Sequence, residues 1–185
     1  STDREDSFFQ RPEIMTALSL LQSVSNPLQD VPLAALLSSP AFSFSFDEIT
    51  GLRLRDKKAP LYLCLCQAAE AGDAKSAAFL ETLAKLRELA AVMGAARFLQ
   101  EAYRITRLPL LCGQDAAAKS NLYLLLEYAL GSESAGWGSL TGFLRYLRRI
   151  RESGKELPAA APPAEENSVR IMSIHKSKGL EFPFC

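Results

Sequence analysis

Apolar residues recur at helical spacing through most of this chain, and this periodicity constrains the fold more than any other feature. In the clearest stretch, residues 74–93, the apolar positions alternate steps of four and three, which places them on one helix face: Phe79, Leu83, Leu86, Ala90 and Met93. A helix with such a stripe must bury it against other elements. The pattern therefore predicts a mainly α fold, a bundle of helices around a shared core.

Further helices are predicted over residues 11–25, 31–37, 61–71, 116–130 and 140–153, with a short one after Phe46. Asp30 and Ser139 are suited to cap two of them, because a short polar side chain can accept a backbone N–H of the first turn. Pro109 is expected to end a helix that begins after Gly94, since proline cannot donate to the helical ladder.

The composition changes near the C-terminal end. Residues 154–167 are rich in proline and alanine, which is typical of a linker, and the following residues alternate apolar and polar side chains as a half-buried strand does. We therefore expect residues 28–153 to form a helical subdomain, with residues 1–27 leading into it. Residues 168–185 would begin a different, α/β domain.

The 21 basic and 21 acidic residues cancel, so any contact with nucleic acid must be local. The four cysteines lack the paired spacing of a zinc site, and no metal site is expected. No apolar run reaches the roughly 20 residues of a membrane-spanning helix, and no secretory leader is recognisable. These features predict a cytoplasmic protein without membrane contact.

The segment from Ser168 to Pro183 carries the most specific motif, S-V-R-I-M-S-I-H-K-S-K-G-L-E-F-P. It resembles motif V of the UvrD-like superfamily-one DNA helicases, in which a strand is followed by Ser or Thr, an apolar residue, His and then Lys-Gly-Leu-Glu-Phe. The resemblance implies a short C-terminal β-strand from a truncated P-loop-type α/β motor domain. It also implies that Ser173 and His175 contact the DNA backbone.

By the same resemblance, Gly179 and Glu181 lie near the bound nucleotide, and Lys178 is a candidate phosphate contact. Lys178 does not belong to a Walker A loop, because the order G-x-x-x-x-G-K-[ST] is absent. The chain also lacks a Walker B carboxylate pair and the arginine of motif VI. We therefore expect no catalytic residue in this chain, no bound cofactor and no ATP hydrolysis by the chain alone.

Two N-terminal segments extend the resemblance. Residues 7–14, S-F-F-Q-R-P-E-I, are similar to the segment after motif IV, and residues 26–40 resemble the AddA (RexA) proteins of bacterial helicase-nucleases. Gln10 and Pro12 depart from the family's Glu and Lys without preventing a helix. The resemblance implies a fragment that spans the helical insertion of the second motor domain, from its exit to its return.

The parent protein would then use ATP and Mg²⁺ to translocate along single-stranded DNA toward a duplex junction, in the repair of double-strand breaks. The resemblance further implies an exonuclease domain and a partner subunit of the AddB/RexB type. Two alternatives stay open at this point. One is a plain UvrD, Rep or RecB-like helicase, and the other is an all-helical protein-interaction module whose terminal motif is coincidental.

The last predicted helix carries a run of arginines. Arg145, Arg148 and Arg149 share a face by their spacing, and Arg151 follows closely. Such a stripe could contact duplex phosphates. It could also be a solvated face with partners such as Glu152, and this interpretation is preferred for the chain alone. Trp137, between two glycines, is expected to pack on the bundle rather than to stack on a base.

Overall fold

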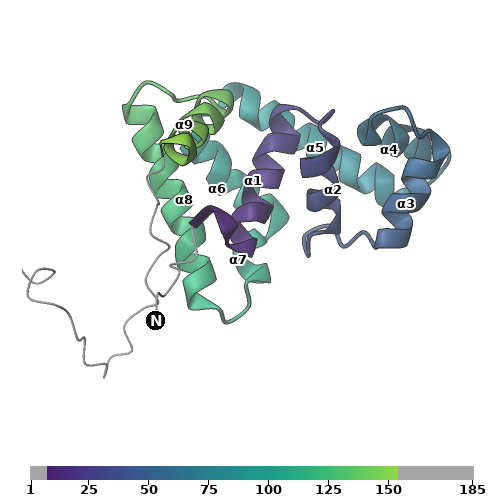
Figure 1. Cartoon of the computed structure of the whole chain (residues 1–185), viewed down its shortest axis with the longest axis horizontal. Helices are drawn as coiled ribbons and strands as arrows, with labels where there is room; N and C mark the ends of the chain where they lie inside the picture. The colour runs from purple at the N-terminus through teal and green to yellow at the C-terminus, as the bar shows by residue number, and fades with distance from the viewer. Residues whose placement is uncertain (1–7, 154–185) are drawn as a thin grey trace, which may run out of the picture.

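The computed structural model describes residues 8–153, and this part consists of nine α-helices and one short 3-10 helix, without a strand (Figure 1). In chain order these are η1 (Phe8–Gln10), α1 (Pro12–Ser25), α2 (Asp30–Ser38), α3 (Phe46–Arg55), α4 (Leu61–Glu70), α5 (Ala74–Val92), α6 (Ala95–Thr106), α7 (Leu108–Leu111), α8 (Ala116–Ser134) and α9 (Leu140–Glu152). The predicted mainly α fold is confirmed. The predicted linker and C-terminal strand lie outside the described residues.

Helix α1 lies at the centre of the packing and contacts α2, α5, α8 and α9. It begins at Pro12, where the fixed φ of proline suits a first turn and its missing N–H has no partner to lose. Its core face consists of side chains that are at most 3% exposed: Ile14, Ala17, Leu20, Leu21 and Val24. Burying one such leucine or isoleucine contributes roughly 1.5–3 kcal/mol, so α1 holds its neighbours together.

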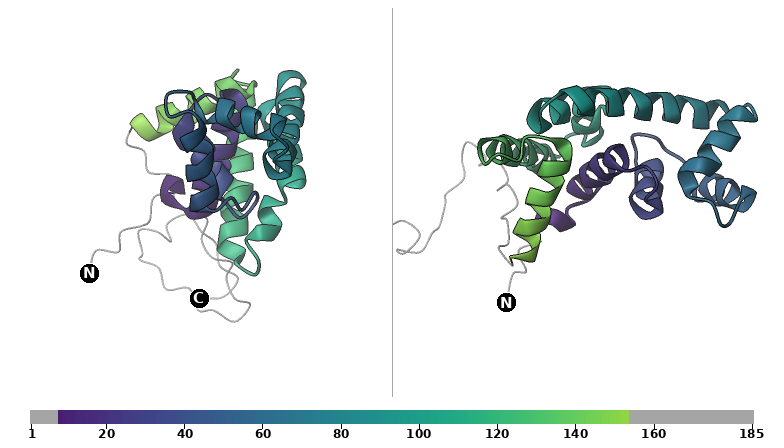
Figure 2. Two further views of the ribbon diagram at one scale, coloured as in Figure 1. Left: turned by 90° about the vertical axis from the view of Figure 1, so that its right-hand side faces the viewer. Right: turned by 90° about the horizontal axis from the view of Figure 1, so that it is seen from above.

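The helical body is elongated, with α8 and α9 at one end and α3 and α4 at the other (Figure 1). Helix α5 runs along the body between these ends and packs on α4, α1 and α6 (Figure 2). Its predicted stripe is buried at Phe79, Leu83 and Leu86. Asp73 fixes its start, because the carboxylate accepts the Ser76 N–H at 3.1 Å.

Local capping explains two further helix starts. The Ser45 hydroxyl oxygen accepts the Glu48 N–H at 3.1 Å, and the Glu48 carboxylate accepts the Ser45 N–H at 2.6 Å, which completes a capping box at α3. The Ser139 hydroxyl oxygen accepts the Gly142 N–H at 3.0 Å at the start of α9. The predicted Ser139 cap is therefore confirmed.

Two predicted boundaries are wrong, for identifiable reasons. Asp30 is the first residue of α2 rather than its cap, because its carboxylate accepts the Leu61 N–H at 2.8 Å and pairs with Arg53 at 2.9 Å. Pro109 does not end α6. That helix already stops before Arg107, which adopts a left-handed backbone with φ of 55°, and Pro109 lies in the first turn of α7, where proline is tolerated.

Candidate nucleic-acid interface

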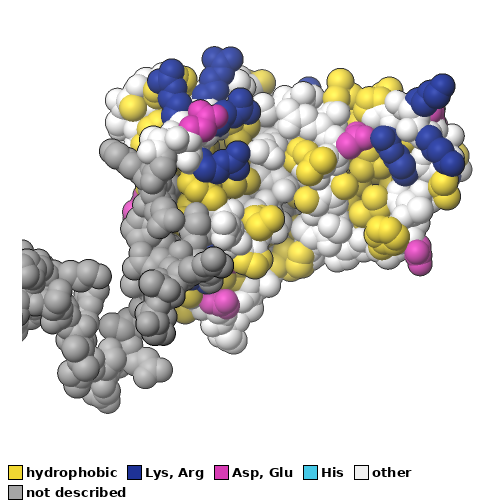
Figure 3. Space-filling view, viewed as in Figure 1, with side chains coloured by type: hydrophobic (Ala, Val, Ile, Leu, Met, Phe, Trp, Pro, Cys, Tyr) yellow, Lys and Arg dark blue, Asp and Glu magenta, His cyan; other side chains and the backbone are white. Residues whose placement is uncertain are grey.

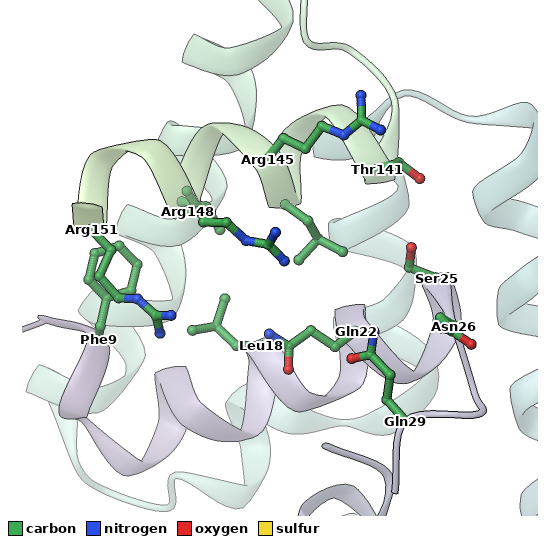
Figure 4. Close-up of a pocket in the computed structure, with 12 residues that line it drawn as sticks. Phe9, Leu18, Gln22, Ser25, Asn26, Gln29, Thr141, Arg145, Arg148 and Arg151 are labelled. Atoms are coloured by element: carbon green, nitrogen blue, oxygen red, sulfur yellow. The ribbon is translucent and has the colours of Figure 1, made fainter. Parts of the chain in front are cut away.

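A groove between α1 and α9 brings together side chains from the two ends of the described chain (Figure 4). The α9 side contributes Thr141, Leu144, Arg145, Leu147, Arg148 and Arg151, and the α1 side contributes Phe9, Leu18, Gln22, Ser25, Asn26 and Gln29. The three leucines are buried or half-buried, whereas the arginines and the amides of the α1 side are exposed. The groove therefore has an apolar floor and polar walls.

The amphipathic pattern of α9 sets the direction of the arginines. Leu140, Phe143 and Leu147 are buried and fix one face of the helix against the core. Arg145, Arg148 and Arg151 follow one another at steps of three residues, so they project from a neighbouring strip of the same helix. In Figure 4 the Arg148 guanidinium extends over the groove toward α1.

Among the described residues, the groove carries positive charge without a counter-charge. No carboxylate of residues 8–153 lines it. Ion pairs between described residues involve other cations, and none of Arg145, Arg148 and Arg151 lies within 4.0 Å of an aspartate or glutamate there. The predicted pairing with Glu152 is therefore not found in the described part of the chain. This observation weakens the interpretation of the stripe as a surface neutralised by its neighbours.

The facing wall supplies neutral hydrogen-bonding groups. Gln22, Asn26 and Gln29 present amides, and Ser25 presents a hydroxyl. The side-chain Oδ1 of Asn26 accepts the Leu28 N–H at 3.1 Å, and the side-chain NH₂ group is a further donor. Both walls can therefore donate hydrogen bonds to an acceptor-rich ligand.

Arg149 does not line the groove. Its guanidinium lies over the Trp137 ring, 4.9 Å from the centroid, in a cation–π contact. Trp137 is half-buried and packs beside α9, in agreement with the prediction that it lies on the bundle. The structure thus groups Arg151, rather than Arg149, with Arg145 and Arg148.

The other predicted site residues are Ser173, His175, Lys178, Gly179 and Glu181, and they lie outside the described residues. Their roles stay predictions. The α1 side of the groove was missed by the sequence analysis, although a signal was present. The polar residues Gln22, Ser25, Asn26 and Gln29 follow the spacing i, i+3, i+4, i+7 beside a helix that is otherwise mostly apolar.

Two other kinds of site find no support among the described residues. No group of three His, Cys, Asp or Glu side chains there could hold a metal ion. None of the described helices combines the length and apolar character needed to cross a membrane. The groove itself encloses about 210 Å³, below the roughly 300–1,000 Å³ of pockets that enclose small molecules. A groove of this volume can hold only part of a larger ligand.

Comparison with known proteins gives the chain a family context. No family model matches it. It is 41% identical over 189 residues to the A subunit of the ATP-dependent helicase/nuclease of Acetivibrio thermocellus, and 39% identical over 192 residues to the protein of that name from Thermoanaerobacter pseudethanolicus. For the Geobacillus kaustophilus protein the identity is 40% over 196 residues. The chain is homologous to one segment of these helicase/nuclease proteins.

The extent of this similarity decides between the interpretations left open by the sequence. It covers 98–99% of this chain, so it runs through the helical region and is not restricted to the terminal motif. The predicted resemblance to the AddA type is confirmed, and a coincidental motif on an unrelated helical module is contradicted. The chain spans about 15% of the length of the curated relatives it matches.

Proposed function

We propose that this chain is the helical insertion of the second motor domain of an ATP-dependent DNA helicase/nuclease, together with the motif V strand and loop. The observation that carries the proposal is the identity of 39–41% through nearly the whole chain to the A subunits of ATP-dependent helicase/nucleases. The parent protein would couple ATP hydrolysis, with Mg²⁺, to movement along DNA during repair of double-strand breaks in the bacterial cytoplasm. It would work with a partner subunit of the AddB/RexB type.

The position of the two ends of the described chain supports an insertion. An inserted domain leaves and re-enters its host at neighbouring points, so its ends must lie close together. Phe9, near the first described residue, and Arg151, near the last, line the same groove (Figure 4). Phe8 anchors this entry, because it is fully buried and packs edge to face on Tyr128 of α8 with ring centroids 5.6 Å apart. The arrangement supports departure and re-entry near residues 9 and 151, and the boundary at residue 28 stays a prediction.

The motif V residues are assigned by their place in the motif. Ser173 and His175 would contact the phosphodiester backbone of single-stranded DNA, and Gly179 and Glu181 would lie on the nucleotide side, with Lys178 as a further phosphate contact. The chain contains neither a Walker A loop nor the other elements that surround Mg²⁺ during phosphoryl transfer. Purified alone, it should therefore show no DNA-stimulated ATP turnover, and robust turnover would contradict the proposal.

The proposal is tested by comparing His175→Ala with Glu181→Ala in the full-length protein. His175→Ala should raise the DNA concentration that half-maximally stimulates ATP hydrolysis by tenfold or more, because a hydrogen bond to a charged group contributes about 1.5–3 kcal/mol. Its KM for ATP should change little. Glu181→Ala should raise the KM for ATP and leave the DNA dependence nearly unchanged. Equal effects of both variants on ATP, with none on DNA, would contradict the assigned roles.

A further inference from the structure

We propose that the groove between α1 and α9 binds the phosphodiester backbone of one DNA strand. Arg145, Arg148 and Arg151 would hold the phosphates, and Gln22 and Gln29 of the facing wall would donate further hydrogen bonds. The choice of DNA as the polyanion rests on the proposed function. The groove itself adds a contact in the helical region, separate from the motif V residues.

The spacing of the arginines fits successive phosphates of a strand. An α-helix rises about 1.5 Å per residue, so Arg145 and Arg151 are separated by about 9 Å along the α9 axis. One DNA strand carries a phosphate about every 3.4 Å along a duplex axis. This distance covers between two and three phosphate intervals, so the three side chains span about three or four consecutive phosphates. A guanidinium can donate two parallel hydrogen bonds to a phosphate, which makes arginine well suited to this contact.

The surroundings of the arginines strengthen the case. They have no carboxylate partner among the described residues, so binding a phosphate breaks no ion pair there. The lining that the described residues form offers amides and hydroxyls but no anion that would repel a strand. Leu18, Leu144 and Leu147 keep the floor of the groove apolar, which strengthens charge interactions above it.

An acidic protein segment would bring the same sign of charge, but the groove suits it less well. The cores of protein interfaces rely on large apolar or aromatic anchors seated in pockets. Here the walls are polar, the aromatic Phe9 is half-buried, and the floor consists of short leucine surfaces. Cations at a regular step on a rigid helix match a backbone with regularly repeated charges.

The test measures binding of the 185-residue chain to fluorescein-labelled oligonucleotides by fluorescence anisotropy. One probe is a single strand of about 20 nucleotides and the other is the corresponding duplex. The salt slope is the change in the logarithm of the binding constant per unit change in the logarithm of the salt concentration. Three phosphate contacts give a slope of about −2.1 for a single strand and about −2.7 for a duplex. Raising the salt from about 50 to about 200 mM should therefore weaken binding roughly 20-fold for the single strand and roughly 40-fold for the duplex. The probe that binds more tightly, with the salt slope expected for its form, shows whether the groove binds single-stranded or duplex DNA.

Two charge-matched triple variants separate the groove from net charge. Arg145→Ala/Arg148→Ala/Arg151→Ala should weaken DNA binding at least tenfold at low salt and flatten the salt slope by about 2.1 for a single strand or about 2.7 for a duplex. The control replaces three exposed lysines outside the groove with alanine: Lys57, Lys58 and Lys85. It should bind within about twofold of the wild type. Circular dichroism checks that both variants keep the wild-type helix content.

A neutral variant tests the opposite wall without changing charge. Gln22→Ala/Gln29→Ala should weaken binding severalfold and leave the salt slope unchanged, because no ionic contact is lost. Unchanged affinity of this variant would remove the α1 wall from the proposal. Equal losses in the lysine triple variant and the arginine triple variant would show that net charge alone attracts DNA, and would overturn the proposal.

Two further outcomes are distinguished. If polyglutamate of equal charge displaces labelled DNA as well as unlabelled DNA does, the groove prefers an acidic protein and the proposal is wrong. A second outcome combines two results: the full-length protein with all three arginines replaced unwinds DNA as the wild type does, and the 185-residue chain shows no loss of DNA binding in the arginine variant. That outcome would refute DNA binding by the groove and leave the proposed function standing. A wild-type parent without ATP-dependent unwinding would instead refute the proposed function.

Discussion

Ser23 provides a direct test of the packing of α1, because removal of its hydroxyl is expected to stabilise the protein. The residue is 0% exposed, and its Oγ has no hydrogen-bond partner among the described residues. Burial of a hydroxyl without a partner costs about 1–3 kcal/mol in protein mutational data. Ser23→Ala removes that cost, and alanine also has the higher intrinsic helix propensity.

The expected gain is smaller than this cost, because removal of Oγ leaves a small space. The neighbouring atoms lose dispersion contacts of about 0.1–0.2 kcal/mol each. We therefore expect Ser23→Ala to raise the free energy of unfolding by about 1 kcal/mol. For a domain of this size that corresponds to an increase in Tm of about 2–4 °C.

Ser132 is the matched control. It is also 0% exposed and helical, but its hydroxyl donates to the Ala129 carbonyl oxygen at 2.7 Å. Loss of such a bond costs about 0.5–1.5 kcal/mol, so Ser132→Ala should leave the stability unchanged or lower it. Urea unfolding of both variants, followed by far-UV circular dichroism, gives the two free-energy changes. The reasoning is refuted if Ser23→Ala destabilises, or if both variants shift by the same amount in the same direction.

Two further predictions concern the anchoring of the chain and its acid stability. Phe8→Ala should lower the free energy of unfolding by about 3–5 kcal/mol, because the ring is fully buried; a loss below about 1 kcal/mol in urea would contradict the anchoring role. Hydrogen bonds, chiefly from the Ser76 hydroxyl and the Lys75 ammonium, hold the pKa of Asp73 and of Glu48 below the ordinary values of 3.8 and 4.5. A lowered folded-state pKa gives stability that is present above the ordinary value and is lost as the pH falls through the folded value. The double variant Asp73→Asn/Glu48→Gln should therefore lose less Tm than the wild type on acidification from about pH 5 to about pH 2, and an equal loss would contradict this.

Sequence alone predicted the helices whose limits depend on local signals. The stripe from Phe79 to Leu86 indicated one long helix over residues 74–93, and α5 runs from Ala74 to Val92. Ser139 caps α9 as expected, because an N-cap hydrogen bond joins residues three apart. In both cases the groups that decide the structure lie within one helix.

Sequence reasoning failed where the deciding partner is distant along the chain. The carboxylate of Asp30 was available as a cap, but the Leu61 N–H, 31 residues away, and Arg53 engage it instead. The arginines of α9 show the same limit. Helical spacing placed Arg145, Arg148 and Arg149 on one face of the helix. Which of them line the groove depends on how α9 packs against α1, which the spacing does not show. Arg149 instead contacts the Trp137 ring and does not line the groove.

The net charge of zero is also a misleading guide to what this surface can bind. At physiological ionic strength a charge is screened over about 8 Å, so carboxylates at the α3 and α4 end of an elongated body have little effect on a groove beside α9. Figure 3 shows Lys and Arg side chains gathered at the α9 end, with an acidic side chain among them, and a second group of Lys and Arg at the opposite end. Of the described residues, three arginines and no carboxylate line the groove, which gives a local charge of three positive units from this part of the chain. Short-range contacts, rather than long-range attraction, should therefore determine DNA binding, and this is why removal of lysines outside the groove should change the affinity so little.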